Sequence, residues 1–102
     1  MATLEELTAK IASVVGADSG LGKSLKIDFK GEGFIHLDGG AVTNDNLPAD
    51  LTVRISRKDL EALGQGRLNP MTAVITGRLA LSDMALATTL LPQMQSLFAK
   101  LS

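Results

Sequence analysis

Residues 84–101 form the segment that most constrains the fold, because they combine strong helical periodicity with almost no charge. Lys100 carries the one charged side chain after Asp83. On a helical wheel of about 100° per residue, the apolar side chains occupy one arc of about 160°, wider than the ordinary stripe of about 100°. Core packing against a sheet explains most of this arc, and we infer that the surplus apolar surface lines a lipid-sized cavity. The apolar residues are Met84, Leu86, Ala87, Leu90, Leu91, Met94, Leu97, Phe98 and Leu101.

Pro92 falls on the opposite, polar side of this segment. A proline inside a helix removes one backbone hydrogen bond, here to residue 88, and on the solvent side it bends a helix rather than ending it. The sequence therefore predicts one bent helix over residues 84–101.

Five segments upstream are predicted as β-strands: four alternate apolar and polar residues, and the short third one follows a bend at Gly39 and Gly40. They lie at about 24–30, 34–38, 41–44, 51–56 and 79–82. A one-residue shift would turn every side chain to the other face, so the alternation predicts which residues point inward. The inward set is Leu25, Ile27, Phe29, Ile35, Leu37, Leu51, Val53, Ile55, Leu79 and Leu81, and Arg54 and Arg78 should point outward.

Capping signals predict three more helices. A capping box marks the start of a helix over residues 4–15. An Asn-Pro pair at residues 69–70 marks the start of the third helix, which should end at residue 77. The N-cap residues are Thr3, Ser56 and Asn69, and Gly64 and Gly77 are placed to end the two short helices.

The composition excludes several classes of function. A chain of 102 residues with 45% apolar content fits one domain, which we assign to residues 1–102. Without cysteine and with one histidine there is no thiolate or His cluster, so we expect no catalytic residues, no metal and no cofactor.

The near absence of aromatic residues and the net charge of −1 argue against nucleic acid as a partner. No apolar run approaches the ~20 residues of a membrane span, and no signal peptide is evident, so we expect a cytoplasmic protein.

Charge is unevenly distributed along the chain. Residues 1–50 contain four Lys/Arg and eight Asp/Glu, and residues 51–102 contain six and three. The second half is therefore cationic, which suits an anionic headgroup at a pocket mouth, although solvated surface is the better explanation of any single one of these cations.

His36 and Asp38 share the outward face of their predicted strand. We interpret His36 as a solvated surface residue, because a catalytic His–Asp pair needs a nucleophile or a metal and the sequence supplies neither.

The order of these elements, with several short motifs, resembles the sterol carrier protein type-2 family, also called the sterol-binding domain family. The likeness is good over about residues 45–95 and looser before that. Ser82 departs from the family pattern, which has glycine there; a serine can still cap the following helix. The matching motifs are Pro48-Ala49-Asp50, Ser56 with Asp59 and Leu60, Gly66-x-x-Asn69-Pro70 with Ala73, Gly77-Arg78-Leu79 and Asp83-Met84-Ala85-Leu86-Ala87.

The resemblance implies an α+β fold, in which a five-stranded, mostly antiparallel sheet has helices packed on one face and encloses an apolar lipid tunnel. It also implies a noncatalytic lipid-binding or transfer protein for fatty acids, fatty acyl-CoA or sterol-like ligands, with transient membrane contact and a monomer or weak dimer. Two alternatives stay open: a dimerisation or interaction module, and an accessory protein that presents isoprenoid-quinone precursors to biosynthetic enzymes. The ligand-binding residues that we expect are Leu63, Met71, Val74, Ile75, Met84, Leu90, Leu91 and Met94.

Overall fold

The computed structural model describes residues 3–17 and 20–100, except for the side chain of Phe98. Leu101, predicted to continue the last helix, lies outside the described residues. The elements follow one another as α1 (Leu4–Val15), β1 (Leu25–Asp28), β2 (Phe34–Asp38), β3 (Ala41–Thr43), β4 (Leu51–Ile55), α2 (Arg57–Gly64), α3 (Pro70–Ile75), β5 (Leu79–Leu81) and α4 (Met84–Ala99).

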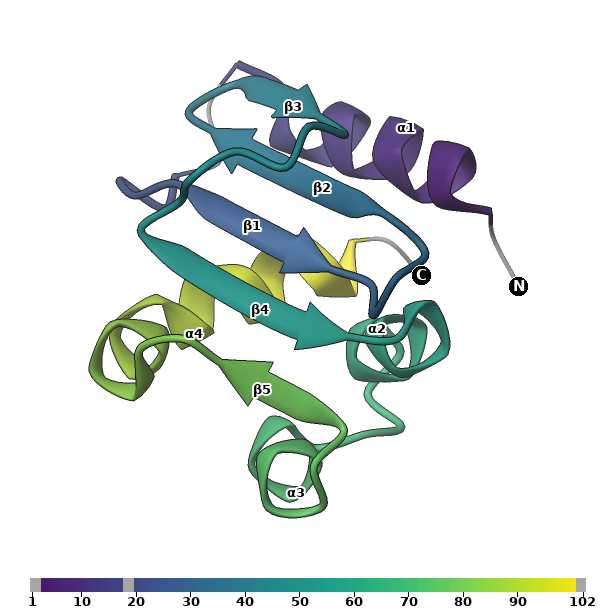
Figure 1. Ribbon diagram of the computed structural model, residues 1–102, viewed down its shortest axis with the longest axis vertical. Helices are drawn as coiled ribbons and strands as arrows, with labels where there is room; N and C mark the ends of the chain where they lie inside the picture. Colours follow the sequence, from purple (N-terminus) through teal and green to yellow (C-terminus); the bar gives the residue numbers. More distant parts are fainter. Residues whose placement is uncertain (1–2, 18–19, 101–102) are drawn as a thin grey trace.

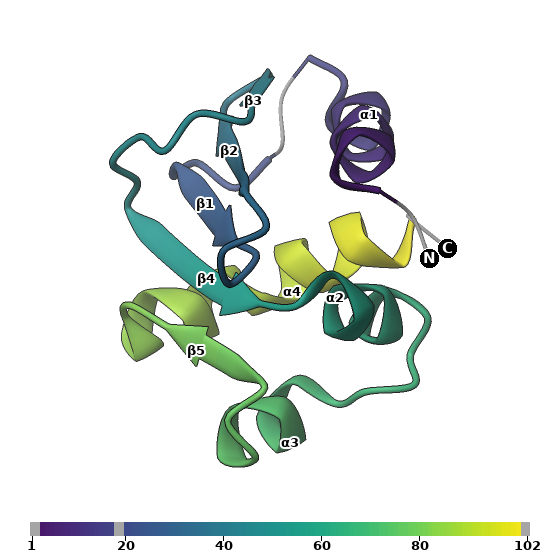
Figure 2. The ribbon, with the colours of Figure 1, turned by 45° about the vertical axis from the view of Figure 1, so that its right-hand side comes forward.

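The five strands form one sheet in the order β3-β2-β1-β4-β5 (Figure 1). The central pair, β1 and β4, is parallel, and the other three pairs are antiparallel. Figure 2 shows α1, α2 and α4 on one side of this sheet, while α3 lies beyond the end formed by β5. The predicted α+β architecture, with a mostly antiparallel sheet covered by helices on one face, is confirmed.

Strand register brings the inward side chains together. Leu25 lies opposite Leu37 on one neighbouring strand and opposite Leu51 on the other. Val53 in turn lies opposite Leu81. Residues opposite each other across a ladder point to the same face, so the alternation of each strand combines into a continuous apolar layer. Arg54 is exposed on the other face, as predicted.

The predicted N-caps all form. Thr3 Oγ1 accepts from Glu6 N, Ser56 Oγ from Asp59 N at 3.1 Å and Asn69 Oδ1 from Met71 N at 2.8 Å. The end of α2 was predicted wrongly, however. Gly64 is its last helical residue, and the left-handed conformation that reverses the chain belongs to Gly66, with φ of 76°. The two glycines are close in sequence, and helical periodicity does not separate them.

The last helix runs without interruption through Pro92, which is exposed, so the proline does not end it. Its first turn is capped by Asp83, whose Oδ1 accepts from Leu86 N at 3.0 Å. Ser82, the expected capping serine, has another role. Its Oγ accepts from Thr52 N at 2.9 Å, while its own N donates to Thr52 O, which extends the pairing between β4 and β5.

His36 is not solvated, which corrects the prediction for that residue. Only 6% of it is exposed, and its Nε2 donates to the carbonyl oxygen of Pro48 at 3.0 Å. The connection from β3 to β4 crosses the outer face of β2 (Figure 1), and it carries the Pro48 carbonyl that binds the imidazole. The alternation of β2 is correct, because His36 does point away from the helices, but a loop distant in sequence buries it.

Candidate functional site

An apolar pocket lies between the β4–β5 edge of the sheet and helices α2, α3 and α4. Its volume is about 60 Å³. No charged side chain lines it, and the polar lining side chains are those of Thr88 and Gln95. The lining residues are Val53, Ile55, Leu60, Leu63, Pro70, Met71, Val74, Leu79, Leu81, Met84, Ala87, Thr88, Leu91, Met94 and Gln95.

Local periodicities explain how these side chains converge. The floor consists of residues two apart on each strand, Val53 and Ile55 on β4 and Leu79 and Leu81 on β5, which point to the same face of the sheet. The wall from α4 consists of residues three or four apart along one face of the helix. These α4 residues are Met84, Ala87, Leu91 and Met94, with Thr88 and Gln95 at the margin.

The pocket contains most of the predicted ligand-binding residues. Leu63, Met71, Val74, Met84, Leu91 and Met94 all line it. Two predicted residues lie elsewhere. Ile75 is 80% exposed at the end of α3, because the buried face of that short helix is centred on Ala73. Leu90 is 6% exposed and belongs to the core.

Sequence reasoning missed the strand side chains of the lining. Val53, Ile55, Leu79 and Leu81 were predicted to point inward, but only as core. Their position in the last two strands, next to the two short helices in the sequence, is the feature that could have indicated a place in the pocket lining. In this structure the same side chains serve as core and as pocket floor.

The pocket is smaller than the expected tunnel. Pockets that hold whole small molecules measure about 300–1,000 Å³, and one water needs about 10–15 Å³. The volume of about 60 Å³ therefore accommodates only a few methyl-sized groups. In the part of the chain that the structure describes, the hollow is a pocket, and a lipid chain requires it to widen.

Two methionines mark where the pocket meets the surface. Met71 on α3 is 58% exposed and Met84 at the start of α4 is 48% exposed, yet both line the pocket. A side chain that is both exposed and part of the lining lies at an opening. One opening of the pocket therefore lies between α3 and the first turn of α4.

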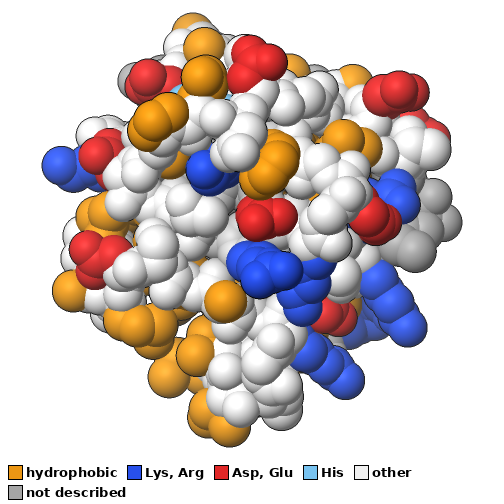
Figure 3. Space-filling view, in the orientation of Figure 1, with side chains coloured by type: hydrophobic (Ala, Val, Ile, Leu, Met, Phe, Trp, Pro, Cys, Tyr) orange, Lys and Arg blue, Asp and Glu red, His pale blue; other side chains and the backbone are white. Residues whose placement is uncertain are grey.

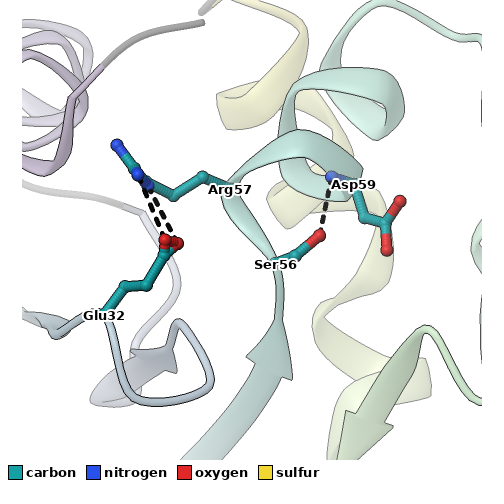
Figure 4. Close-up of polar contacts among 4 residues, drawn as sticks. All are labelled: Glu32, Ser56, Arg57 and Asp59. Carbon is teal, nitrogen blue, oxygen red and sulfur yellow. Dashed lines mark hydrogen bonds and ion pairs between the residues drawn. The ribbon is translucent and has the colours of Figure 1, made fainter.

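A second, polar hollow lies beside α2 and the start of β5. Lys58, Arg67 and Arg78 line it together with Asp59 and Glu61. Nearby, Arg57 forms an ion pair of 3.1 Å with Glu32 of the β1–β2 turn, while Ser56 caps α2 through Asp59 N (Figure 4). The ion pair joins the start of α2 to the β1–β2 turn.

The described residues contain no group of three His, Asp or Glu side chains that could hold a metal ion. Nor is any helix among residues 3–17 and 20–100 long and apolar enough to cross a bilayer.

Residues 1–94 match the SCP-2 sterol transfer family. The chain belongs to this family. An SCP-2 domain is in general a lipid-binding, noncatalytic fold, and family membership agrees with an uncharged pocket between the sheet and the helices. The resemblance inferred from the sequence motifs is thereby confirmed.

Solved structures show the same fold. Sterol Carrier Protein 2 Like 2 from Aedes aegypti superimposes with a TM-score of 0.66 at 19% identity, covering 83% of this chain and 88% of that one. The UbiJ-SCP2 ubiquinone synthesis protein gives a TM-score of 0.58 at 19% identity, covering 90% and 77%. The sec-alkylsulfatase Pisa1 from Pseudomonas sp. gives 0.57 at 26% identity, covering 88% of this chain but only 14% of that enzyme. No curated protein matches the sequence.

Proposed function

We propose that this SCP-2 domain is an intracellular, noncatalytic carrier that holds the apolar part of one long-chain lipid in the pocket. The ligand class comprises fatty acids, fatty acyl-CoA and sterol-like molecules. The observation that carries the proposal is the pocket lining: it has no charged side chain and opens to the surface between two methionines, Met71 and Met84.

Apolar burial supplies enough free energy for useful affinity. Each buried methylene contributes about 0.8 kcal/mol, so ten contribute about 8 kcal/mol before the costs of ordering the chain. About 8 kcal/mol corresponds to a dissociation constant of about 1 μM, and the ordering costs raise the net dissociation constant above that limit. A carrier must also release its cargo, and this range allows release.

Entry of a chain requires the pocket to widen, and α3 is the element best placed to move. It has six residues, lies at the end of the sheet and packs chiefly against β5. A short helix with one buried residue, Ala73, has little apolar burial to resist displacement. Methionine side chains can then re-pack around an inserted chain.

Six of the lining residues are our candidates for ligand contact. They are Leu63, Met71, Val74, Met84, Leu91 and Met94. We exclude Ile75 and Leu90 from this set, since neither side chain lines the pocket.

A displacement assay tests the proposal. A fluorescent fatty acid should bind with a micromolar dissociation constant, and unlabelled acyl chains should displace it, while lipid esters incubated with the protein should stay intact. Absence of saturable binding by acyl chains, acyl-CoA and sterols would overturn the carrier function.

A second candidate function is the presentation of an isoprenoid-quinone precursor to biosynthetic enzymes. The likeness to the UbiJ-SCP2 ubiquinone synthesis protein favours including it, although at 19% identity that likeness concerns the fold. Native mass spectrometry of co-purifying ligand separates the two, because a carrier of fatty acids retains an acyl chain and a presenting protein retains a prenylated ring.

The third candidate is a dimerisation or interaction module, and the match to a small part of Pisa1 is the observation that favours it. An empty pocket together with a stable dimer in light scattering would support this function over the other two.

A further inference from the structure

The α4 wall of the pocket carries two polar side chains on an otherwise apolar lining. Thr88 and Gln95 line the pocket and are also exposed, so they lie where the pocket meets water. Seven residues of helix span about 10 Å, and the half-buried Leu91 lies between the two on the same face. Met84, at the opening beside α3, precedes Thr88 by one helical turn, so the margin of the pocket continues along α4. We call Thr88 and Gln95 the polar rim.

The Thr88 hydroxyl is arranged to accept a further hydrogen bond and not to donate one. Its Oγ1 donates to the carbonyl oxygen of Met84 at 2.8 Å, which commits its one proton to the helix. Among residues 3–17 and 20–100, no donor occupies the lone pairs of this oxygen. A ligand group that pairs with Thr88 therefore needs a proton to donate, which an alcohol has and an ionised carboxylate lacks.

The Gln95 amide provides both a donor and an acceptor. In the part of the chain that the structure describes, no hydrogen bond involves this side chain, so its carbonyl oxygen and its N–H groups are available to a ligand. A hydroxyl can use either, because it donates to the carbonyl oxygen or accepts from an N–H. The amide can also donate to a carboxylate, but it does not neutralise the charge.

The pocket offers no cation to an anionic ligand head. None of its lining residues is charged, and helix α4 contains no charged residue from its first position to its last. The nearest charges along the chain are Asp83 and Lys100, which have opposite sign and lie five residues from the nearer rim side chain. An ionised head at this margin would lose part of its hydration without gaining a partner of opposite charge, which opposes binding.

The cations of the second half of the chain gather elsewhere. Lys58, Arg67 and Arg78 line the polar hollow beside α2, which shares no residue with the pocket. Figure 3 shows a group of Lys and Arg side chains toward α2, apart from the hydrophobic side chains around β5 and the start of α4. The cationic character read from the sequence therefore does not reach the pocket lining.

We propose that the polar rim selects the head of the bound lipid and favours a neutral hydroxyl over an ionised carboxylate. The hydrocarbon chain occupies the widened pocket, and the hydroxyl donates to Thr88 Oγ1 or pairs with the Gln95 amide, according to how far the chain enters. The inference rests on the proposed carrier function and adds to it the chemistry of the ligand head.

Three ligands with the same hydrocarbon chain separate charge from hydrogen bonding. Decanol is neutral and donates a proton, methyl decanoate is neutral and only accepts, and decanoate is charged and only accepts. Displacement of a fluorescent fatty acid at pH 7 gives a dissociation constant for each ligand. Decanol also leaves water more readily than decanoate does, so the informative quantity is the ratio of the decanoate and decanol dissociation constants, compared between wild type and variants.

Removal of the rim should abolish the preference for a hydroxyl. In the double variant Thr88→Val with Gln95→Leu, the ratio should fall about fivefold, the factor that one net hydrogen bond supplies, because decanol loses its partners. The matched control is Thr89→Val with Ser96→Leu, at exposed positions of the same helix outside the pocket lining. Thr89 Oγ1 also donates to a helix carbonyl, that of Ala85 at 3.1 Å, so the control makes the same change to the helix. The control should keep the wild-type ratio.

A cation placed on the rim should reverse the preference. Gln95→Lys should bind decanoate about fivefold more tightly than wild type and methyl decanoate equally well, because the new charge compensates the ionised head. Ser96→Lys adds the same charge outside the lining and should give a smaller gain.

Circular dichroism confirms that each variant is folded. A ratio that is the same in wild type and in the double rim variant overturns head selection and leaves the carrier function intact. An equal fall of the ratio in the rim and control variants also overturns it, because the cause is then a change in the helix and not in the lining. If wild type binds neither the fluorescent fatty acid nor any of the three ligands, the carrier function itself fails.

Discussion

Asp50 and Ser24 are joined by three hydrogen bonds. Asp50 Oδ2 accepts from Ser24 N at 2.9 Å and from Ser24 Oγ at 3.1 Å, and Asp50 N donates to Ser24 Oγ at 2.8 Å. Leu51 N then donates to Ser24 O at 3.2 Å. The two residues immediately precede β1 and β4, so they hold together the starts of the two parallel strands at the centre of the sheet.

These bonds make stability depend on pH. The Ser24 amide and hydroxyl lower the pKa of Asp50 below its usual value of 3.8, and Lys23 adds to the effect. A lowered pKa in the folded state stabilises the protein at neutral pH, and this contribution disappears as pH falls through the folded-state pKa. Asp50→Asn should therefore unfold at lower urea concentration than wild type at pH 7, and the difference should shrink below about pH 4.

Asp45→Asn is the control for Asp50→Asn, because it removes another exposed carboxylate from the same connection. A difference between wild type and Asp50→Asn that stays constant from pH 7 to pH 3 would contradict the role of the Asp50 charge.

His36 should contribute to stability and not to ligand binding. His36→Ala removes a buried ring and leaves the Pro48 carbonyl without its donor, which costs about 2 kcal/mol. Urea denaturation measures the loss. Fatty-acid affinity of the folded variant should match wild type, because the imidazole lies on the opposite face of the sheet from the pocket. Weakened lipid binding by a folded variant would show that this face takes part in the site.

Leu91 tests the pocket wall. It is half-buried and lines the pocket, so Leu91→Glu places a carboxylate against a bound acyl chain while its outer edge still reaches water. Desolvating that charge opposes binding, and affinity for a fluorescent fatty acid should fall at least tenfold with a near-native circular dichroism spectrum. Ser96→Glu, at an exposed position of the same helix, should bind normally. Equal affinities of the two variants would refute the assignment of this wall.

Ser82 tests the departure from the family pattern. Ser82→Gly removes the hydroxyl that accepts from Thr52 N and increases the freedom of the unfolded chain, so the free energy of unfolding should fall by about 1 kcal/mol. Ser82→Thr keeps the acceptor and should lose less. Thermal unfolding measures both variants, and a glycine variant as stable as wild type would show that this hydrogen bond contributes nothing.

Local patterns predicted the strands and caps because their causes lie within a few residues. The alternation around Val53 and the cap at Asn69 need no knowledge of the rest of the chain. The parallel pairing of β1 with β4 depends on contacts across 26 residues, such as Ser24 with Asp50, and no periodicity reveals it.

The differences between the predicted and the observed positions have the same origin. His36 follows the alternation of its strand, but burial of its ring comes from the loop at Pro48. On α4, a helical wheel identifies the inward side chains but does not separate core residues from pocket-lining residues. Leu90 lies in the core, whereas its neighbour Leu91 lines the pocket. That division depends on where the helix lies over the sheet, which is a tertiary property.

All the pocket-lining residues come from positions 53–95. The helix α1 and the strands β1 to β3 support the site from outside without lining it. If the proposed function holds, ligand preference is encoded within one continuous stretch of the gene, and a library restricted to the codons of β5, α3 and α4 can explore new cargo while the N-terminal half stays unchanged.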